Sequence, residues 1–125
     1  MKKKITLIIS LLFGLMFINA GLNKFLNYMP IPEDLPQDMI NLMSAMMQIS
    51  WLIPLIGLME IAGGILFIIP KTRALGAIIL VPILVGITLI NITSAPSGLP
   101  LVIVLLVIEV WAILNNREKY LAMVR

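Results

Sequence analysis

The sequence predicts an all-α membrane protein: a bundle of four transmembrane helices, with a short amphipathic interfacial helix between helices 1 and 2 and both termini in the cytoplasm. Composition is the first reason, because 61% of the 125 residues are hydrophobic and 12% are charged. A soluble domain of this size has too little interior to bury so much apolar surface, so lipid must solvate much of it. The second reason is that the apolar residues form four long runs separated by short polar connections. The chain is expected to be a single transmembrane domain.

The first span is predicted over residues 5–26, directly after three lysines. A basic start followed by an apolar run is also typical of a secretory signal peptide. However, Ile18-Asn19-Ala20 lacks the small residue that a cleavage site needs three positions before the cut, and the apolar pattern continues to Leu26. We therefore expect the first span to be retained.

A shorter helix is predicted over residues 36–49. One face carries methionine and leucine, and the other is polar. Because the segment is too short and too polar to span, we expect it to lie at the membrane surface. The thioethers of Met39, Met43, Met46 and Met47 could in principle hold a soft ion such as Cu(I). Methionine is also a common apolar filler, and we predict no metal site.

Three further spans are predicted at residues 51–69, 74–93 and 98–114. Trp51 suits a membrane–water boundary, where its apolar ring and its N–H group are both accommodated. Pro82 should kink the third span, because it cannot donate to the carbonyl four residues earlier. Pro100 suits the first turn of the fourth span.

The basic residues predict the orientation. With both termini in the cytoplasm, eight of the nine lysines and arginines lie inside and only Lys24 lies at the outer edge. That asymmetry is typical of inner-membrane proteins. The net charge of +3 is therefore interpreted as a topology signal, and we expect no nucleic-acid partner.

The chain has no cysteine and no histidine. This composition excludes disulfides, thiolate chemistry and imidazole ligands or bases. Whether the protein is an enzyme stays open, and we expect no catalytic activity of its own.

Glu60 is the first candidate for a functional residue, because it lies in the middle of the second span. A charged side chain there costs roughly 2.5–3.5 kcal/mol on insertion scales. Glu60 should therefore be protonated, or be ionised beside a donor or cation from another helix. Gly57 and Gly64 lie on its face of the helix, and Gly63 is adjacent, so another backbone can approach closely.

A second group of polar residues lies at the outer end of the first span. Asn19 and Asn23 are one helical turn apart and share a face. Lys24 either extends its ammonium to the headgroups or binds an anionic group, whether Asp34, Asp38 or a ligand.

Asn91 and Glu109 complete the candidate polar pocket. Asn91 adds an amide near the outer end of the third span, and Glu109 lies near the middle of the fourth. If their helices adjoin, Glu60 and Glu109 could share a proton as a coupled pair. The alternative role for each buried acid is a structural hydrogen bond between helices.

The chain resembles the DoxX family of small four-span membrane proteins. The resemblance rests on Gly21-Leu22-Asn23-Lys24-Phe25, on Glu60-Ile61-Ala62-Gly63-Gly64, and on a basic turn in which Arg73 precedes Ala74. It implies a four-helix bundle in the bacterial inner membrane. It also implies an association with membrane redox complexes, whereas distant relatives act as cargo receptors or chaperones. Carried over by position, Asn23, Lys24, Glu60 and Gly64 are the residues expected to matter.

These observations lead to one functional hypothesis and two alternatives. The first is an accessory subunit of a membrane redox assembly, with an intramembrane pocket for a quinone or similar small ligand. The second is a scaffold or chaperone that recognises other membrane proteins through small-residue faces. A small proton-coupled transporter is the third and the weakest, because no inverted repeat is evident. Besides the lipid bilayer, the expected partner is another membrane protein, and a homo-oligomer stays open.

Overall fold

The computed structural model describes residues 2–26, 28, 35–94 and 96–124, and these form helices and turns without a strand. The helices are α1 (Lys2–Leu26), α2 (Gln37–Gln48), α3 (Leu52–Ile68), α4 (Arg73–Ser94), the 3₁₀ turn η1 (Pro96–Gly98), α5 (Leu99–Asn115) and α6 (Arg117–Leu121). The all-helical prediction is confirmed for this part of the chain. Pro100 lies in the first turn of α5, as expected. α4 runs as one helix through Pro82.

Three helical segments are long and apolar enough to cross a bilayer: α1, α4, and η1 together with α5. The fourth candidate, α3, has 17 residues, whereas a perpendicular crossing takes about 20. α2 and α3 meet at a bend of 96°, and the pair passes the same test only as one bent span. The structure therefore supports three or four spans. The bend turns α2 across the direction of α3, which is the relation expected between a surface helix and a span.

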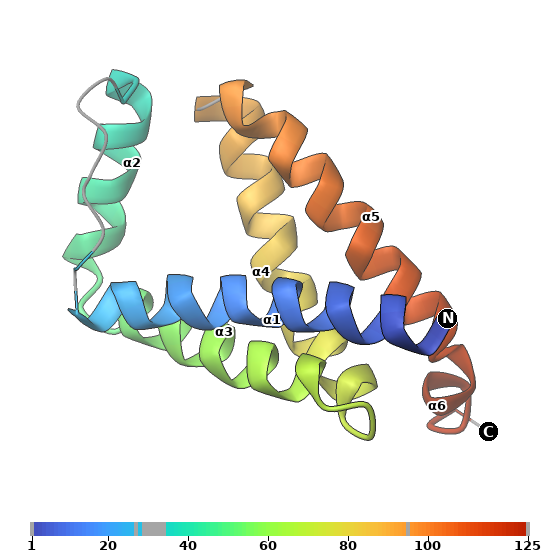
Figure 1. The fold of residues 1–125 in the computed structure, drawn as a ribbon. Helices are drawn as coiled ribbons and strands as arrows, with labels where there is room; N and C mark the ends of the chain where they lie inside the picture. Colours follow the sequence, from blue (N-terminus) through green and yellow to red (C-terminus); the bar gives the residue numbers. More distant parts are fainter. Residues whose placement is uncertain (1, 27, 29–34, 95, 125) are drawn as a thin grey trace.

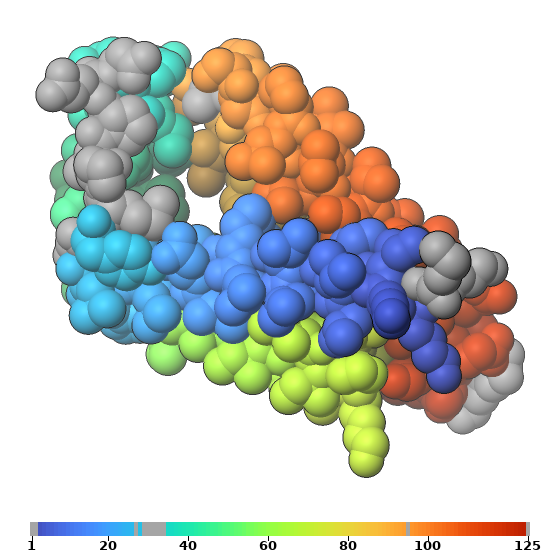
Figure 2. Space-filling view, viewed as in Figure 1, coloured from blue at the N-terminus to red at the C-terminus, as the bar shows by residue number. Residues whose placement is uncertain are grey.

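The helices pack mainly in chain order. α1 and α3 lie side by side and antiparallel, α4 packs on α3, and α5 packs on α4 (Figure 1). The α4–α5 pair lies at an angle to the α1–α3 pair (Figure 1). The contact between α1 and α5 is at the N-terminal end of α1 (Figure 1). Figure 2 shows α1 across the front, with α5 above it and the end of α3 below it. This arrangement is more open than four columns around one axis.

Close backbone contact between glycines explains why α1 and α3 form the tightest pair. A Cβ built on Gly21 would lie 2.5 Å from the carbonyl oxygen of Gly57, and one on Gly64 would lie 2.6 Å from that of Gly14. No larger residue fits at such distances without separating the helices. The structure thus places Gly57 and Gly64 against α1. Gly63 faces α4 instead, where a Cβ would meet Leu80 at 2.8 Å.

The interior is apolar and aromatic. The ring of Phe13 lies with its centroid 5.0 Å from that of Phe17 and 4.6 Å from that of Phe67, which joins α1 to α3. These rings continue into a buried cluster with residues of α4 and α5, including Leu80, Leu84, Leu105 and Ala112. The outward faces are also apolar: Leu12 of α1 is 64% exposed and Val107 of α5 is 63% exposed. Outward-facing leucine and valine at this density fit a protein solvated by lipid.

Candidate functional site

A buried ion pair joins α1 to α3. The ammonium of Lys24 lies 2.5 Å from Oε1 of Glu60. Glu60 comes from the middle of α3 and is 2% exposed, whereas the side chain of Lys24, in the last turn of α1, is 26% exposed. It is the only ion pair among the residues that the structure describes. The pair therefore has one closed side, at the carboxylate, and one open side, at the lysine.

The glycine contacts put the two charges within reach. Because Gly21 and Gly57 bring the backbones together, the stem of Lys24 runs along α3, and a Cβ on Gly57 would lie 3.3 Å from the Cβ of Lys24. The ammonium meets Glu60 in place of Asp38, which the sequence offered as one partner. The other suggested partner, Asp34, lies outside the described residues.

Each charge of this pair offsets most of the free energy that it costs to bury the other charge. An isolated charge in an apolar interior is strongly unfavourable, and removing one partner of a buried pair costs about 3–5 kcal/mol because the other is left uncompensated. The ammonium has three N–H donors and contacts a single carboxylate oxygen of Glu60, so it can still donate to a carbonyl or an anionic group on its open side. The pair can therefore hold a polar headgroup and offer it a proton.

Asn19 and Asn23 occupy the same end of α1. The hydroxyl of Tyr28 donates to the backbone carbonyl of Asn19 at 2.9 Å and also contacts its side-chain oxygen. Tyr28 thus folds back over the end of α1. The sequence analysis did not predict a role for this tyrosine. Its position just beyond an apolar helix was the signal that could have indicated one. Asn23 is half-buried beside Lys24.

The other two predicted residues lie elsewhere. Asn91 donates to the carbonyl of Ile87 on its own helix at 2.7 Å, and its side-chain oxygen lies 2.1 Å from where a Cβ on Gly98 would be. It therefore lies in the last turns of α4, against Gly98 of η1. Glu109 is 4% exposed, in α5, and both its carboxyl oxygens lack a hydrogen-bond partner among the described residues. No interaction in the described part of the chain joins it to Glu60.

Arg73 has a role that the sequence did not predict. Its Nε donates to the carbonyl of Phe67 at 2.9 Å and its Nη2 to that of Ile68 at 3.2 Å. The hydroxyl of Thr72 donates to the carbonyl of Leu66 at 2.9 Å. Together they satisfy carbonyls that the end of α3 leaves without intrahelical partners. A Thr-Arg pair just beyond the proline that follows this apolar helix was the available signal.

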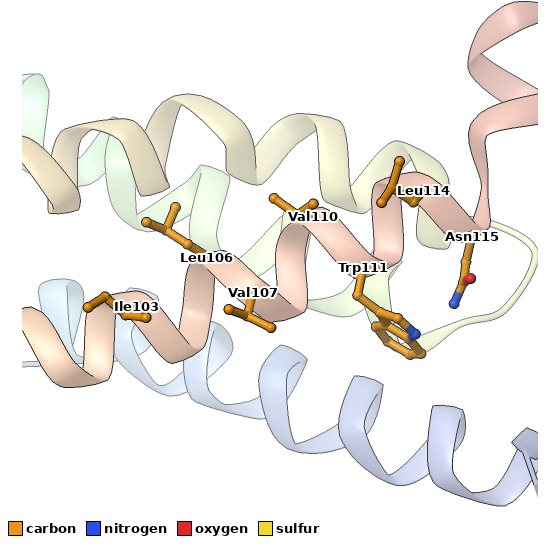
Figure 3. Close-up of a pocket in the computed structure, with 7 residues that line it drawn as sticks. All are labelled: Ile103, Leu106, Val107, Val110, Trp111, Leu114 and Asn115. Atoms are coloured by element: carbon orange, nitrogen blue, oxygen red, sulfur yellow. The ribbon is translucent and has the colours of Figure 1, made fainter.

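Two surface grooves of the described chain do not include the Lys24–Glu60 pair. One of about 530 Å³ is lined only by residues of α5: Ile103, Leu106, Val107, Val110, Trp111, Leu114 and Asn115 (Figure 3). It is apolar apart from the amide of Asn115 and the indole N–H of Trp111. The other lies between the start of α1 and the α3–α4 turn. Access to the ion pair is therefore through the exposed part of Lys24.

Comparison with known proteins gives a family. The DoxX family model matches residues 5–93, which contain both Lys24 and Glu60 but not α5. A Bacillus subtilis (strain 168) protein described as uncharacterized protein YwoB is 37% identical over 70 residues, covering 56% of this chain and 46% of that protein. The match thus spans about half the length of this relative, and no solved structure matches. Because the family model covers well over half of the sequence, the chain belongs to the DoxX family.

Proposed function

We propose that this protein is an accessory subunit of a redox assembly in the bacterial inner membrane and binds a quinone headgroup at Lys24 and Glu60. The supporting observation is the ion pair held at 2.5 Å between two apolar helices, with its lysine partly open. A quinone carbonyl is an acceptor that a spare N–H of Lys24 can bind. The isoprenoid tail would lie along the lipid-facing surface.

The proposed topology has four spans with both termini in the cytoplasm. The C-terminal segment and the α3–α4 turn meet at one end, where the hydroxyl of Tyr120 donates to the carbonyl of Ala74 at 2.8 Å. Lys119 reaches the carbonyl of Lys71 nearby, at 3.5 Å. The start of α1 lies near this end as well (Figure 1). The end rich in lysine and arginine is assigned to the cytoplasm.

Quinone binding can be tested with conservative variants. Purified protein in nanodiscs is titrated with a short-tailed quinone, and binding is followed by the shift in thermal unfolding temperature. Glu60→Gln and Lys24→Gln should each weaken binding at least tenfold, equivalent to about 1.4 kcal/mol. Glu109→Gln is the matched control, because it changes another buried carboxyl outside the proposed site, and it should bind like the unmodified protein.

A membrane measurement connects binding with function. Quinone-dependent activity of membranes that carry Glu60→Gln should fall while the amount of protein stays the same. Unchanged activity and unchanged quinone affinity at equal abundance would exclude the proposal.

A scaffold or chaperone for other membrane proteins is the second candidate. This candidate relies on exposed small-residue faces, but the structure uses Gly14, Gly21, Gly57 and Gly64 within the chain, between α1 and α3. What favours this candidate is instead the apolar groove along α5 (Figure 3). If the protein is a scaffold, pull-down in mild detergent should recover one defined partner protein. Val107→Lys in the groove should prevent that recovery.

A further inference from the structure

The second groove lies between the start of α1 and the turn that joins α3 to α4. It has a volume of about 530 Å³ and is lined by Lys3, Thr6 and Leu7 on one side and by Pro70 and Arg73 on the other. Its lining thus combines two cations and a hydroxyl with two apolar side chains. It lies at the opposite end of α1 from the Lys24–Glu60 pair.

No carboxylate of the described residues neutralises the two cations of this groove. Neither Lys3 nor Arg73 forms an ion pair with another described residue. The acid of α6, Glu118, is exposed and also forms no ion pair, while Lys71 and Lys119 add positive charge at the same end. The groove therefore has a net positive lining, and the described part of the chain supplies no counter-ion to it.

Arg73 is held in place by the end of α3. It is 8% exposed, and its two hydrogen bonds to the end of α3 fix the guanidinium at 2.9 and 3.2 Å from the accepting oxygens. A guanidinium has five N–H donors, so three stay available after these bonds. Lys3 and Thr6 lie one turn apart on α1 and share a face. Arg73 can thus supply a fixed donor, and Lys3 an adjustable one.

We propose that this groove binds the phosphate of an anionic phospholipid. The phosphate would accept hydrogen bonds from Lys3, Thr6 and Arg73, and the acyl chains would follow the exposed apolar side of α1 through Leu7 and Leu11. A groove at the end of membrane-spanning helices lies at headgroup depth, where basic pockets bind anionic lipids. Free inorganic phosphate would supply the charge but not the apolar contact. This inference does not depend on quinone binding.

Native mass spectrometry of the protein released from mixed vesicles tests the proposal. The vesicles contain equal amounts of phosphatidylglycerol and phosphatidylcholine. The unmodified protein should retain phosphatidylglycerol in preference, and Lys3→Gln should retain at least threefold less. Lys4→Gln is the matched control, because it removes the same charge from the neighbouring position outside the groove, and it should behave like the unmodified protein.

Two further variants and one competitor complete the experiment. Thr6→Val should also lower retention, and Arg73→Lys should lower it partly if the protein stays folded. Inorganic phosphate at equal concentration should not displace the lipid. Equal retention of the two lipids, equal losses in the Lys3 and Lys4 variants, or displacement by inorganic phosphate would each overturn the proposal.

Discussion

Lys24 and Glu60 depend on each other for their place in an apolar interface. The carboxylate is buried, and its charge is balanced by one ammonium 2.5 Å away. Because the lysine comes from the last turn of α1, it also lies where a helix favours a cation. Neither residue would be tolerated alone at this depth in its charged form.

Truncating one partner should therefore cost more than truncating both. We expect Lys24→Met alone to lower the free energy of unfolding in detergent by about 3–5 kcal/mol, because it leaves the buried carboxylate of Glu60 unpaired. Glu60→Leu should cost less, because the ammonium that it leaves unpaired is partly exposed. The double variant should recover most of that loss. Reversible unfolding in increasing denaturant measures all three variants. A double variant as unstable as the sum of the singles would show that the two charges do not interact.

Glu109 presents the opposite case, a buried carboxyl without a partner. Its two oxygens, and the hydroxyl of Ser10, lack hydrogen bonds within the described part of the chain. Leaving such a group unsatisfied costs about 1–3 kcal/mol. Glu109→Leu should therefore raise the unfolding temperature, whereas Glu118→Leu, at an exposed position, should leave it nearly unchanged. If Glu109→Leu lowers stability, the carboxyl has a partner in the membrane.

The spacing of residues along each helix predicts which side chains share a face, but it does not predict which helices lie next to each other. The position of Glu60 inside an apolar span, with glycines on its face, was enough to predict a cation or donor from another helix. That Lys24 supplies it was not predicted uniquely, because its position in the sequence places it near the outer edge. Only the close approach of α1 and α3 brings the ammonium inward. Likewise, no pattern in the sequence shows which helices adjoin Asn91 and Glu109.

At the scale of elements, the contact between α1 and α3 is the most demanding in the fold. Gly21 and Gly64 both face a backbone carbonyl oxygen across the interface, at distances that no Cβ can occupy. The sequence predicted that Gly57 and Gly64 permit close packing, but not that Gly14 and Gly21 form the other half of the contact, because it does not show which helices adjoin.

Alanine substitution should distinguish the glycines of this contact from a glycine that has room for a side chain. Gly21→Ala and Gly64→Ala force the backbones apart and should destabilise the protein by about 1–3 kcal/mol. Gly86→Ala is the control, because a Cβ there meets nothing within 4 Å, and it should be neutral or slightly stabilising. The unfolding midpoints of the three variants in one detergent give the comparison. Equal effects at all three positions would rule out this account of the α1–α3 contact.

Among the hydrogen bonds that attach the short helix α6, the one made by Tyr120 should respond to pH. Tyr120 donates to the carbonyl of Ala74 at 2.8 Å, and burial, followed by the negative charge of Glu109, raises the pKa of Tyr120 above its ordinary value of 10.0. Because the folded state favours the protonated phenol, this contribution is fully present below about pH 10 and is lost as the pH rises through the folded pKa.

Hydrogen exchange of the α6 amides at increasing pH tests this attachment. Protection, corrected for the intrinsic pH dependence of exchange, should fall above pH 10. Tyr120→Phe should weaken protection by about 0.5–1.5 kcal/mol at neutral pH and should remove the tyrosine-linked fall. A variant that keeps the same fall would place the titrating group elsewhere, for example at the neighbouring lysines.

At the scale of the whole molecule, the number of spans decides on which side of the membrane the α3–α4 turn and the C-terminal segment lie. If α3 crosses, the turn at Lys71 lies on the same side as both termini. If only α1, α4 and α5 cross, that turn lies on the opposite side from the N-terminus, and so does the C-terminal segment. The charge asymmetry favours the first arrangement, because it keeps Lys71, Arg73, Arg117 and Lys119 with the lysines of the N-terminus.

Single cysteines can distinguish the two topologies cleanly, because the chain has none of its own. In intact spheroplasts, a membrane-impermeant maleimide should label Gln48→Cys and Ser97→Cys but not Lys71→Cys or Glu118→Cys. Disrupting the membrane should make all four reactive, which controls for burial. Three spans would give a different pattern, in which Lys71→Cys and Glu118→Cys react from outside while Ser97→Cys is protected. That pattern would place the basic end of α3 outside and would exclude the four-span arrangement.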